Sequence, residues 1–151
     1  MKPLLVAVIT LGALAGPRAQ SPGARVDWEK LRPEVLQHYR SLVQLDTTSG
    51  HETRAVEYLK KVLESEGIPT QTFALNPARA NLVARLKGNG SKRPLLILAH
   101  TDVVGVAREK WPVDPFGAVM KDGYVWGRGS KDDKPVLTGN LIAMLMLKRL
   151  G

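Results

Sequence analysis

Hydrophobic and polar residues alternate with a helical period in two early stretches of the chain. From residue 27 to residue 45, and again from 52 to 67, apolar residues recur every three or four positions. This spacing predicts two amphipathic helices, each with one face turned toward a core. Pro33 fits the first turn of the first helix, and Gly67 followed by Pro69 predicts where the second one ends.

The pattern changes to that of strands after the second helix. Residues 70–75 and 81–86 are short runs of strand type, and glycines, Asn89 and Ser91 follow the second one. The apolar run Leu95–Ala99 predicts a strand buried on both faces. Residues 116–126 predict a hairpin that turns at Lys121-Asp122-Gly123.

A last helix is predicted from Asp132 onward, and its residues are apolar on nearly every side. Such a helix belongs inside an α/β layer and has to be covered by another element. The order of helices and strands predicts an α/β sandwich with a mixed sheet. Ligands gather at the carboxyl ends of strands in such sheets, and His100 lies at that end of the apolar run.

Length and composition describe one globular domain. The chain has 151 residues, of which 44% are hydrophobic and 24% charged. It stops at Gly151, directly after the last helical pattern. A glycine suits a natural helix end, but a truncated chain would stop there equally well, and the motifs described below favour truncation.

The net charge of +8 raises the possibility of nucleic-acid binding. The basic residues are scattered over loops and polar helix faces without interleaved aromatic residues, so we expect no nucleic-acid partner. The chain contains no cysteine and therefore no disulfide, which neither requires nor excludes an oxidising compartment.

The N-terminus resembles a signal peptide. Lys2 precedes an apolar run that reaches Ala15, about the length of a signal-peptide core and too short to span a bilayer. Cleavage near Ala15 or Ala19 would define a signal peptide of residues 1–19, a linker of residues 20–26 and a domain of residues 27–151. Cleavage after Ala19 would remove Lys2 and Arg18, lowering the net charge from +8 to +6.

These features predict a secreted or periplasmic protein that has no stable membrane anchor after cleavage. The alternative is that the apolar run is a buried helix or an uncleaved anchor.

The residues most suited to chemistry lie between the apolar run and the last helix. A strand end would fix His100 in position, and Asp102 two residues later could accept the second ring N–H of its imidazole. Asp132 at a helix entrance could turn its carboxylate toward the same cavity. Gly127 and Gly129 would let the backbone turn closely beside it. Imidazole and carboxylate suit Zn²⁺, and also Mn²⁺ or Co²⁺.

Each of these residues also has an ordinary structural interpretation. A histidine after a strand is often simply hydrogen-bonded, and Asp132 or Asp133 could be a helix N-cap. The two glycines could serve only a turn. His38 and His51 have no carboxylate neighbour at a strand end, and we expect both on the surface.

Taken together, three ordered motifs resemble the co-catalytic metallopeptidases of family 20. They are His-Thr-Asp-Val-Val after the apolar run, Trp-x-x-Asp-Pro-Phe at 111–116, and Asp-Gly-Tyr-Val-Trp-Gly-Arg-Gly-Ser-Lys-Asp-Asp-Lys at 122–134. That family includes aminoacylase, carboxypeptidase G, succinyl-diaminopimelate desuccinylase and carnosine dipeptidase. The resemblance is densest over residues 95–134 and extends more loosely to residues 44–48 and 52–67.

The resemblance implies a fold and a role for each matching residue. The fold would be a helix-flanked mixed β-sheet sandwich, the catalytic domain of a co-catalytic zinc exopeptidase, truncated before an inserted dimerisation domain. His100 would ligate one metal, Asp102 would be a catalytic residue as the acidic partner that clamps His100, and Asp132 would bridge two metals. Asp133 and Lys134 would be motif neighbours without a chemical role.

The implied activity is hydrolysis of peptide or N-acyl amide bonds through a metal-activated water, with two divalent ions in the full-length enzyme. Zn²⁺ is the expected metal, with Co²⁺ or Mn²⁺ as alternatives. A glutamate base and further ligands are not identifiable, and after Lys134 the sequence has no acidic residue or histidine. We therefore expect the isolated chain to be inactive and any homodimer to require the full-length form. The alternative is a non-catalytic binding or scaffold protein derived from this fold.

Overall fold

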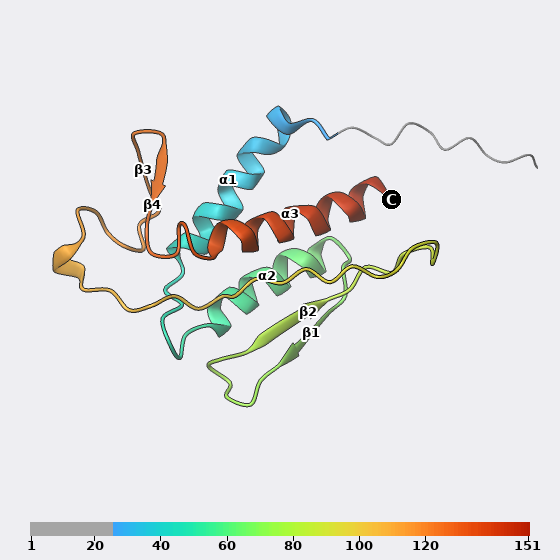
Figure 1. Cartoon of the computed structure of the whole chain (residues 1–151), viewed down its shortest axis with the longest axis horizontal. Helices are drawn as coiled ribbons and strands as arrows, with labels where there is room; N and C mark the ends of the chain where they lie inside the picture. The colour runs from blue at the N-terminus through green and yellow to red at the C-terminus, as the bar shows by residue number, and fades with distance from the viewer. Residues whose placement is uncertain (1–25) are drawn as a thin grey trace, which may run out of the picture.

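The computed structural model describes residues 26–151 (Figure 1). The predicted signal peptide, and the predicted linker apart from Val26, lie outside the described residues. Within the described part, no helix is both long enough and apolar enough to cross a bilayer.

Both predicted N-terminal helices are confirmed, as α1 (Trp28–Gln44) and α2 (Thr53–Ser65). Asp27 caps α1, because its Oδ1 accepts a hydrogen bond from the backbone N–H of Lys30 at 3.2 Å. Beyond the end of α2, Gly67 has a φ of +68°, the left-handed conformation that reverses the chain after a helix.

His38 was expected on the surface, and that expectation is wrong. Its side chain is buried between α1 and α2, where its Nδ1 lies 2.7 Å from the hydroxyl of Tyr58. The prediction failed because the tertiary structure brings Tyr58 of α2, a residue distant in sequence, against this histidine. His51 is exposed, as predicted.

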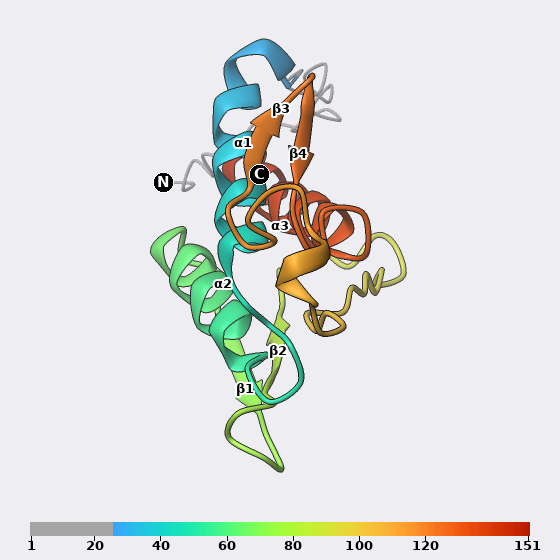
Figure 2. The same ribbon diagram turned by 90° about the vertical axis from the view of Figure 1, so that its left-hand side faces the viewer.

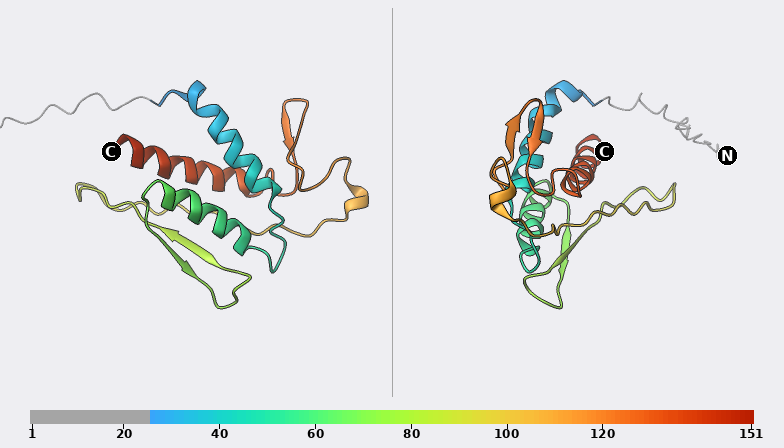
Figure 3. Two further views of the ribbon diagram at one scale, coloured as in Figure 1. Left: turned by 180° about the vertical axis from the view of Figure 1, so that it is seen from behind. Right: turned by 60° about the vertical axis from the view of Figure 1, so that its left-hand side comes forward.

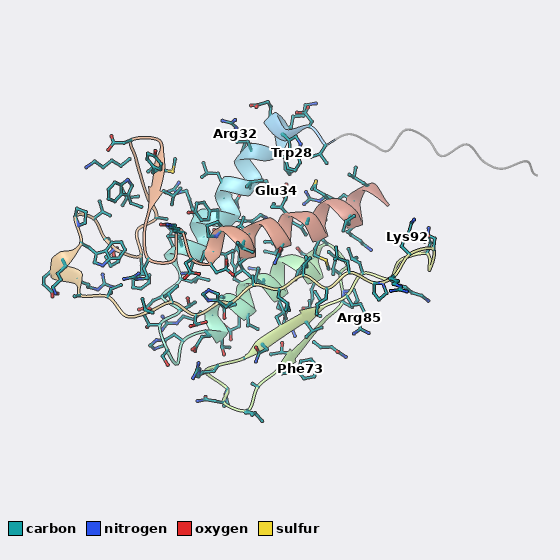
Figure 4. The ribbon with its side chains drawn as sticks, viewed as in Figure 1. Trp28, Arg32, Glu34, Phe73, Arg85 and Lys92 are labelled. Atoms are coloured by element: carbon teal, nitrogen blue, oxygen red, sulfur yellow. The ribbon has the colours of Figure 1, made fainter. Side chains whose placement is uncertain are left out.

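Two strands follow α2, shorter than their predicted ranges. β1 (Thr70–Phe73) and β2 (Asn81–Ala84) pair antiparallel, with Thr70 opposite Ala84. This hairpin lies along α2 on the side away from α1 and α3 (Figure 3). Its outer face is open, and Phe73 projects from it away from the helices (Figure 4).

The second hairpin is confirmed as β3 (Val119–Lys121) and β4 (Tyr124–Trp126). Asp122 and Gly123 connect the strands with φ angles of +54° and +78°, the two positive values that a tight two-residue hairpin turn needs. The two hairpins lie at opposite ends of the molecule (Figure 2). They therefore form two separate two-stranded sheets.

The prediction of a strand at Leu95–Ala99 inside a mixed sheet is wrong for the described residues. The segment is extended but pairs with no strand, and Leu95 is 87% exposed where burial on both faces was expected. One isolated parallel bridge, between Thr48 and Val103, is the only parallel pairing in residues 26–151. An apolar run can specify a strand but not supply the neighbouring strand that would bury it. The architecture is thus mixed α/β with small antiparallel sheets.

The last predicted helix is α3 (Lys134–Leu150), which begins two residues later than expected. One face packs against α1 and α2, while Val136 and Leu147 on the other side are exposed. The three helices enclose the main core. Its buried residues are Leu31, Leu42, Ala55, Leu59, Leu63, Ile68, Leu137, Leu141, Ile142 and Leu145.

Candidate metal centre

His100 is carried by the unpaired extended segment, and side chains of the α3 region hold that segment in place. The backbone N–H of His100 donates to Oδ2 of Asp133 at 3.1 Å. Two residues earlier, the carbonyl of Leu98 accepts from the side-chain amide of Asn140 at 3.1 Å. The histidine is therefore positioned by polar contacts with the helix rather than by a sheet.

The loop of residues 127–130 brings the acidic pair to the histidine. A Cβ atom added at Gly127 would lie 2.4 Å from Cγ1 of Val43 on α1, and one at Gly129 would lie 2.8 Å from Cγ1 of Val103. Gly129 also has a φ of +81°. The close backbone approach predicted for these two glycines is confirmed, because no larger residue fits without displacing a neighbour.

The structure brings His100 and three aspartates together. Nε2 of His100 lies 2.9 Å from Oδ1 of Asp132, and Nδ1 lies 3.2 Å from Oδ1 of Asp102. One ligand atom each from His100, Asp132 and Asp133 lies within 4.8 Å of the others. The peptide bond between Asp132 and Asp133 is cis.

One imidazole and two carboxylates are a donor set that fits Zn²⁺, Co²⁺ or Mn²⁺. Three protein ligands with open positions are also the usual composition of a catalytic zinc site. The cluster is open to water, since the side chains of His100 and Asp132 are 48% and 84% exposed. These donors suffice for one ion, and a pair of ions needs further ligands.

The surrounding carboxylates favour the charged form of His100. Its pKa is raised above the usual value chiefly by the hydrogen bond with Asp132. Burial opposes this shift, and charge attraction to Asp102 and Asp133 adds to it. Metal binding needs a neutral ring nitrogen, so an ion at this site would compete with that proton.

Two residues that the sequence interpretation left without a role contact the cluster or its support. Asp133 occupies the N-cap position of α3 but makes no side-chain cap hydrogen bond; its carboxylate accepts from the backbone of His100 instead. Lys134 is buried, and its Nζ donates to the carbonyl of Leu45 at 2.6 Å, which joins α3 to the end of α1. Burial lowers the pKa of Lys134 to about 8.

Tyr39 on α1 also supports the loop, because its hydroxyl donates to the carbonyl of Ser130. The doublet Asp132-Asp133 was a signal for the second carboxylate. Nothing in the local pattern indicated that Lys134, of a type that is rarely buried, would be enclosed.

A cavity of about 390 Å³ adjoins the cluster. It lies between the segment that follows His100 and the loop that carries Asp132, and Trp111 and Arg128 contribute to its wall. The guanidinium of Arg128 lies 5.0 Å from the ring centre of Trp111, within the range of a cation–π contact. The cluster therefore faces a space that could admit a small ligand.

Comparison with known proteins gives relatives for most of the described chain. The sequence model of Peptidase family M20/M25/M40 matches residues 96–151, which include the whole cluster. The chain is 38% identical over 110 residues to a probable succinyl-diaminopimelate desuccinylase of Staphylococcus epidermidis, covering 72% of this chain and 26% of that protein. A protein with the same name in Staphylococcus aureus is 35% identical over 117 residues, covering 76% of this chain and 28% of that protein.

A more distant similarity is to an N-fatty-acyl-amino acid synthase/hydrolase of Xenopus tropicalis. It is 30% identical over 134 residues, covering 82% of this chain and 26% of that protein. The chain thus spans about a quarter of the length of these curated relatives.

Proposed function

Because this chain belongs to peptidase family M20/M25/M40, we propose that it forms part of the active site of a metal-dependent hydrolase of peptide or N-acyl amide bonds. The observation that carries the proposal is the convergence of His100, Asp132 and Asp133 within 4.8 Å. The names of the relatives support the bond class, since they describe removal of a succinyl group and hydrolysis of N-acyl amino acids.

Each residue of the cluster has a proposed role. His100 and Asp132 hold a divalent ion, and Asp133, close enough to contribute a third ligand atom, completes the set that this chain supplies. Asp102 accepts the second ring N–H of His100, which fixes the tautomer and turns Nε2 toward the ion. A bound ion supplies Lewis acidity toward a carbonyl group and toward water.

The full-length enzyme is proposed to hold two such ions, Zn²⁺ first with Co²⁺ or Mn²⁺ as alternatives, and Asp132 would then contact both. Peptides or N-acyl amino acids are the proposed substrates, and the cavity beside the cluster is where they would approach the ion. A homodimer, where one forms, would belong to the full-length form.

The test uses the full-length gene product with zinc titration and hydrolysis of a panel of N-acyl amino acids and dipeptides. We expect His100→Ala and Asp132→Ala each to weaken metal binding at least about 100-fold and to abolish hydrolysis, because each removes a ligand directly. Asp102→Asn should weaken binding about 10- to 100-fold, since it acts through the imidazole.

His51→Ala is the matched control, because His51 is exposed and outside the cluster. It should leave both readouts unchanged. Two tightly bound metals and full activity after both alanine substitutions would exclude the proposed site. Metal binding without any hydrolysis would instead favour a binding or scaffold protein.

Export of the protein is a further part of the proposal, supported by the sequence of residues 1–19 alone. We expect mass spectrometry of the mature protein, recovered from periplasm or medium, to find an N-terminus directly after Ala15 or Ala19. Recovery of the intact chain beginning at Met1 from the cell interior would contradict export.

A further inference from the structure

Arg128 is a cation without a carboxylate partner in the part of the chain that the structure describes. Its side chain makes one long hydrogen bond there, from Nη2 to the carbonyl of Gly105 at 3.5 Å. Its Nε is enclosed and has no hydrogen-bond partner within residues 26–151. Enclosed polar groups are nearly always paired in native proteins, and a guanidinium keeps its charge at any ordinary pH. The charge of Arg128 and most of its terminal N–H groups therefore remain for a ligand.

The guanidinium of Arg128 is held in a fixed position by its neighbours. It lies 5.0 Å from the ring centre of Trp111, within cation–π range. The backbone N–H of Arg128 donates to the carbonyl of Pro115 at 2.6 Å, and the glycines on both sides, Gly127 and Gly129, are buried. A guanidinium that is already ordered loses little conformational entropy when a ligand binds.

Arg128 lines the same cavity as the proposed metal ligands. The cavity of about 390 Å³ has the volume of a small-molecule site, and its wall includes His100 and Asp132 as well as Arg128. The segment and the loop that form it lie at the end of the molecule that carries the β3–β4 hairpin (Figure 1). One small ligand could therefore contact both the metal centre and the guanidinium.

A carboxylate is the ligand group that suits Arg128 best. The planar guanidinium presents paired N–H donors that match the two oxygens of a carboxylate, and the resulting hydrogen bonds are short and charge-assisted. Exposed Lys131 adds positive charge to the same wall, while the acidic residues Asp102 and Asp132 both contact His100. A neutral carboxamide would form only weaker hydrogen bonds with Arg128, and a cationic group would be repelled by it.

We propose that Arg128 is a specificity-determining residue that binds a carboxylate of the substrate while the scissile amide lies at the metal centre. This role rests on the proposed hydrolase function, and it adds the charge of the substrate. The carboxylate could belong to the amino acid half of the substrate or to a dicarboxylic acyl group, since both present the same two oxygens.

Binding to the metal-free full-length gene product is measured first by calorimetry, so that the readout does not depend on hydrolysis. N-acetyl-leucine is compared with N-acetyl-leucinamide, and N-succinyl-leucinamide with N-butyryl-leucinamide. We expect one carboxylate to bind about 10- to 100-fold more tightly than its neutral counterpart, and Arg128→Gln to abolish that difference. The pair that shows the difference identifies the half of the substrate. Arg128→Lys should keep only part of it, because lysine retains the charge without the planar fork.

Hydrolysis is then measured with the zinc-loaded protein. Arg128→Gln should raise KM for the preferred carboxylate substrate about 10- to 100-fold and leave kcat unchanged, because the contact is made equally in the bound substrate and in the transition state. The kcat/KM of the neutral counterpart and the zinc affinity should not change, since Arg128 is not a metal ligand.

Arg108→Gln is the matched control. Arg108 also lies over an aromatic ring, 5.6 Å from the centre of Phe116, but it pairs with Asp114 at 3.0 Å and does not line the cavity. It should change neither readout. Equal binding of carboxylate and neutral ligands by the native protein would overturn the role of Arg128. An equal loss for all substrates in Arg128→Gln would overturn it too, because the arginine would then only support the loop.

The two measurements separate this role from the proposed function. Carboxylate binding that depends on Arg128, without hydrolysis of any of these amides, would uphold the role of Arg128 and reject the hydrolase. Hydrolysis with an unchanged carboxylate preference in Arg128→Gln would do the reverse.

Discussion

Gly129 lies where the loop of residues 127–130 passes under the start of α3. An alanine there would keep a φ of +81° and place its Cβ 2.8 Å from Val103 and 3.0 Å from the side chain of Lys134. We expect Gly129→Ala to lower the free energy of unfolding by about 2 kcal/mol, since backbone strain and overpacking act together. Urea denaturation of the 151-residue chain measures this.

Gly139 provides the matched control, because it lies inside α3 with open space around it. Gly139→Ala should raise the free energy of unfolding by about 0.5–1 kcal/mol, the ordinary difference between the two residues in a helix. Equal effects of the two substitutions would mean that the tight approach at Gly129 does not constrain the loop.

Among the elements, the end of α3 is tied to the other two helices by Arg149. Its guanidinium donates to both carboxylate oxygens of Glu34 on α1, at 2.9 and 2.8 Å, and to Glu66 next to α2. These hydrogen bonds, the largest cause in each case, hold the pKa values of Glu34 and Glu66 below their usual 4.5.

Because these pKa values are lowered on folding, the ion pairs stabilise the fold fully above pH 4.5 and lose that effect as the pH falls through the folded values. We expect the unfolding midpoint to fall further between about pH 6 and pH 3 in the native chain than in Arg149→Gln. Arg32→Gln is the control, since within residues 26–151 Arg32 pairs only with exposed Glu29. Identical pH profiles for all three proteins would show that solvent screens the ion pairs of Arg149 with Glu34 and Glu66.

Over the whole molecule, the described fold exposes its most apolar segment. Leu96 and Leu98 are 78% and 76% exposed on an extended backbone, the arrangement that templates aggregation. We expect Leu96→Lys with Leu98→Lys to reduce light scattering of the concentrated 151-residue chain without lowering its unfolding midpoint. Both side chains contribute little to the folded core.

Val136→Lys with Leu147→Lys is the control for that comparison. It adds the same charge at two exposed positions on α3, where the backbone hydrogen bonds are already made within the helix. A similar reduction in light scattering by both double substitutions would show that the added charge causes the effect, and not the change in the unpaired extended segment.

Local interactions explain why the helices, the second hairpin and the candidate ligands could be predicted from the sequence. Helical spacing determines α1, α2 and α3, with Asp27 capping α1. The Asp122-Gly123 turn determines the second hairpin, because it too depends on contacts within a few residues. The motifs that contain His100, Asp102 and Asp132 identified the family and the candidate ligands.

Only the tertiary structure decided which of those residues meet and what surrounds them. The carboxylate of Asp133 contacts the backbone of His100 and does not cap α3, Lys134 is buried against the end of α1, and His38 is buried beside Tyr58 of α2. Each of these contacts joins residues that are distant in sequence. The apolar run Leu95–Ala99 specified a strand, yet a strand becomes part of a sheet only when another pairs with it. Pairing between distant segments cannot be read from local periodicity, and for this segment the described residues supply no partner.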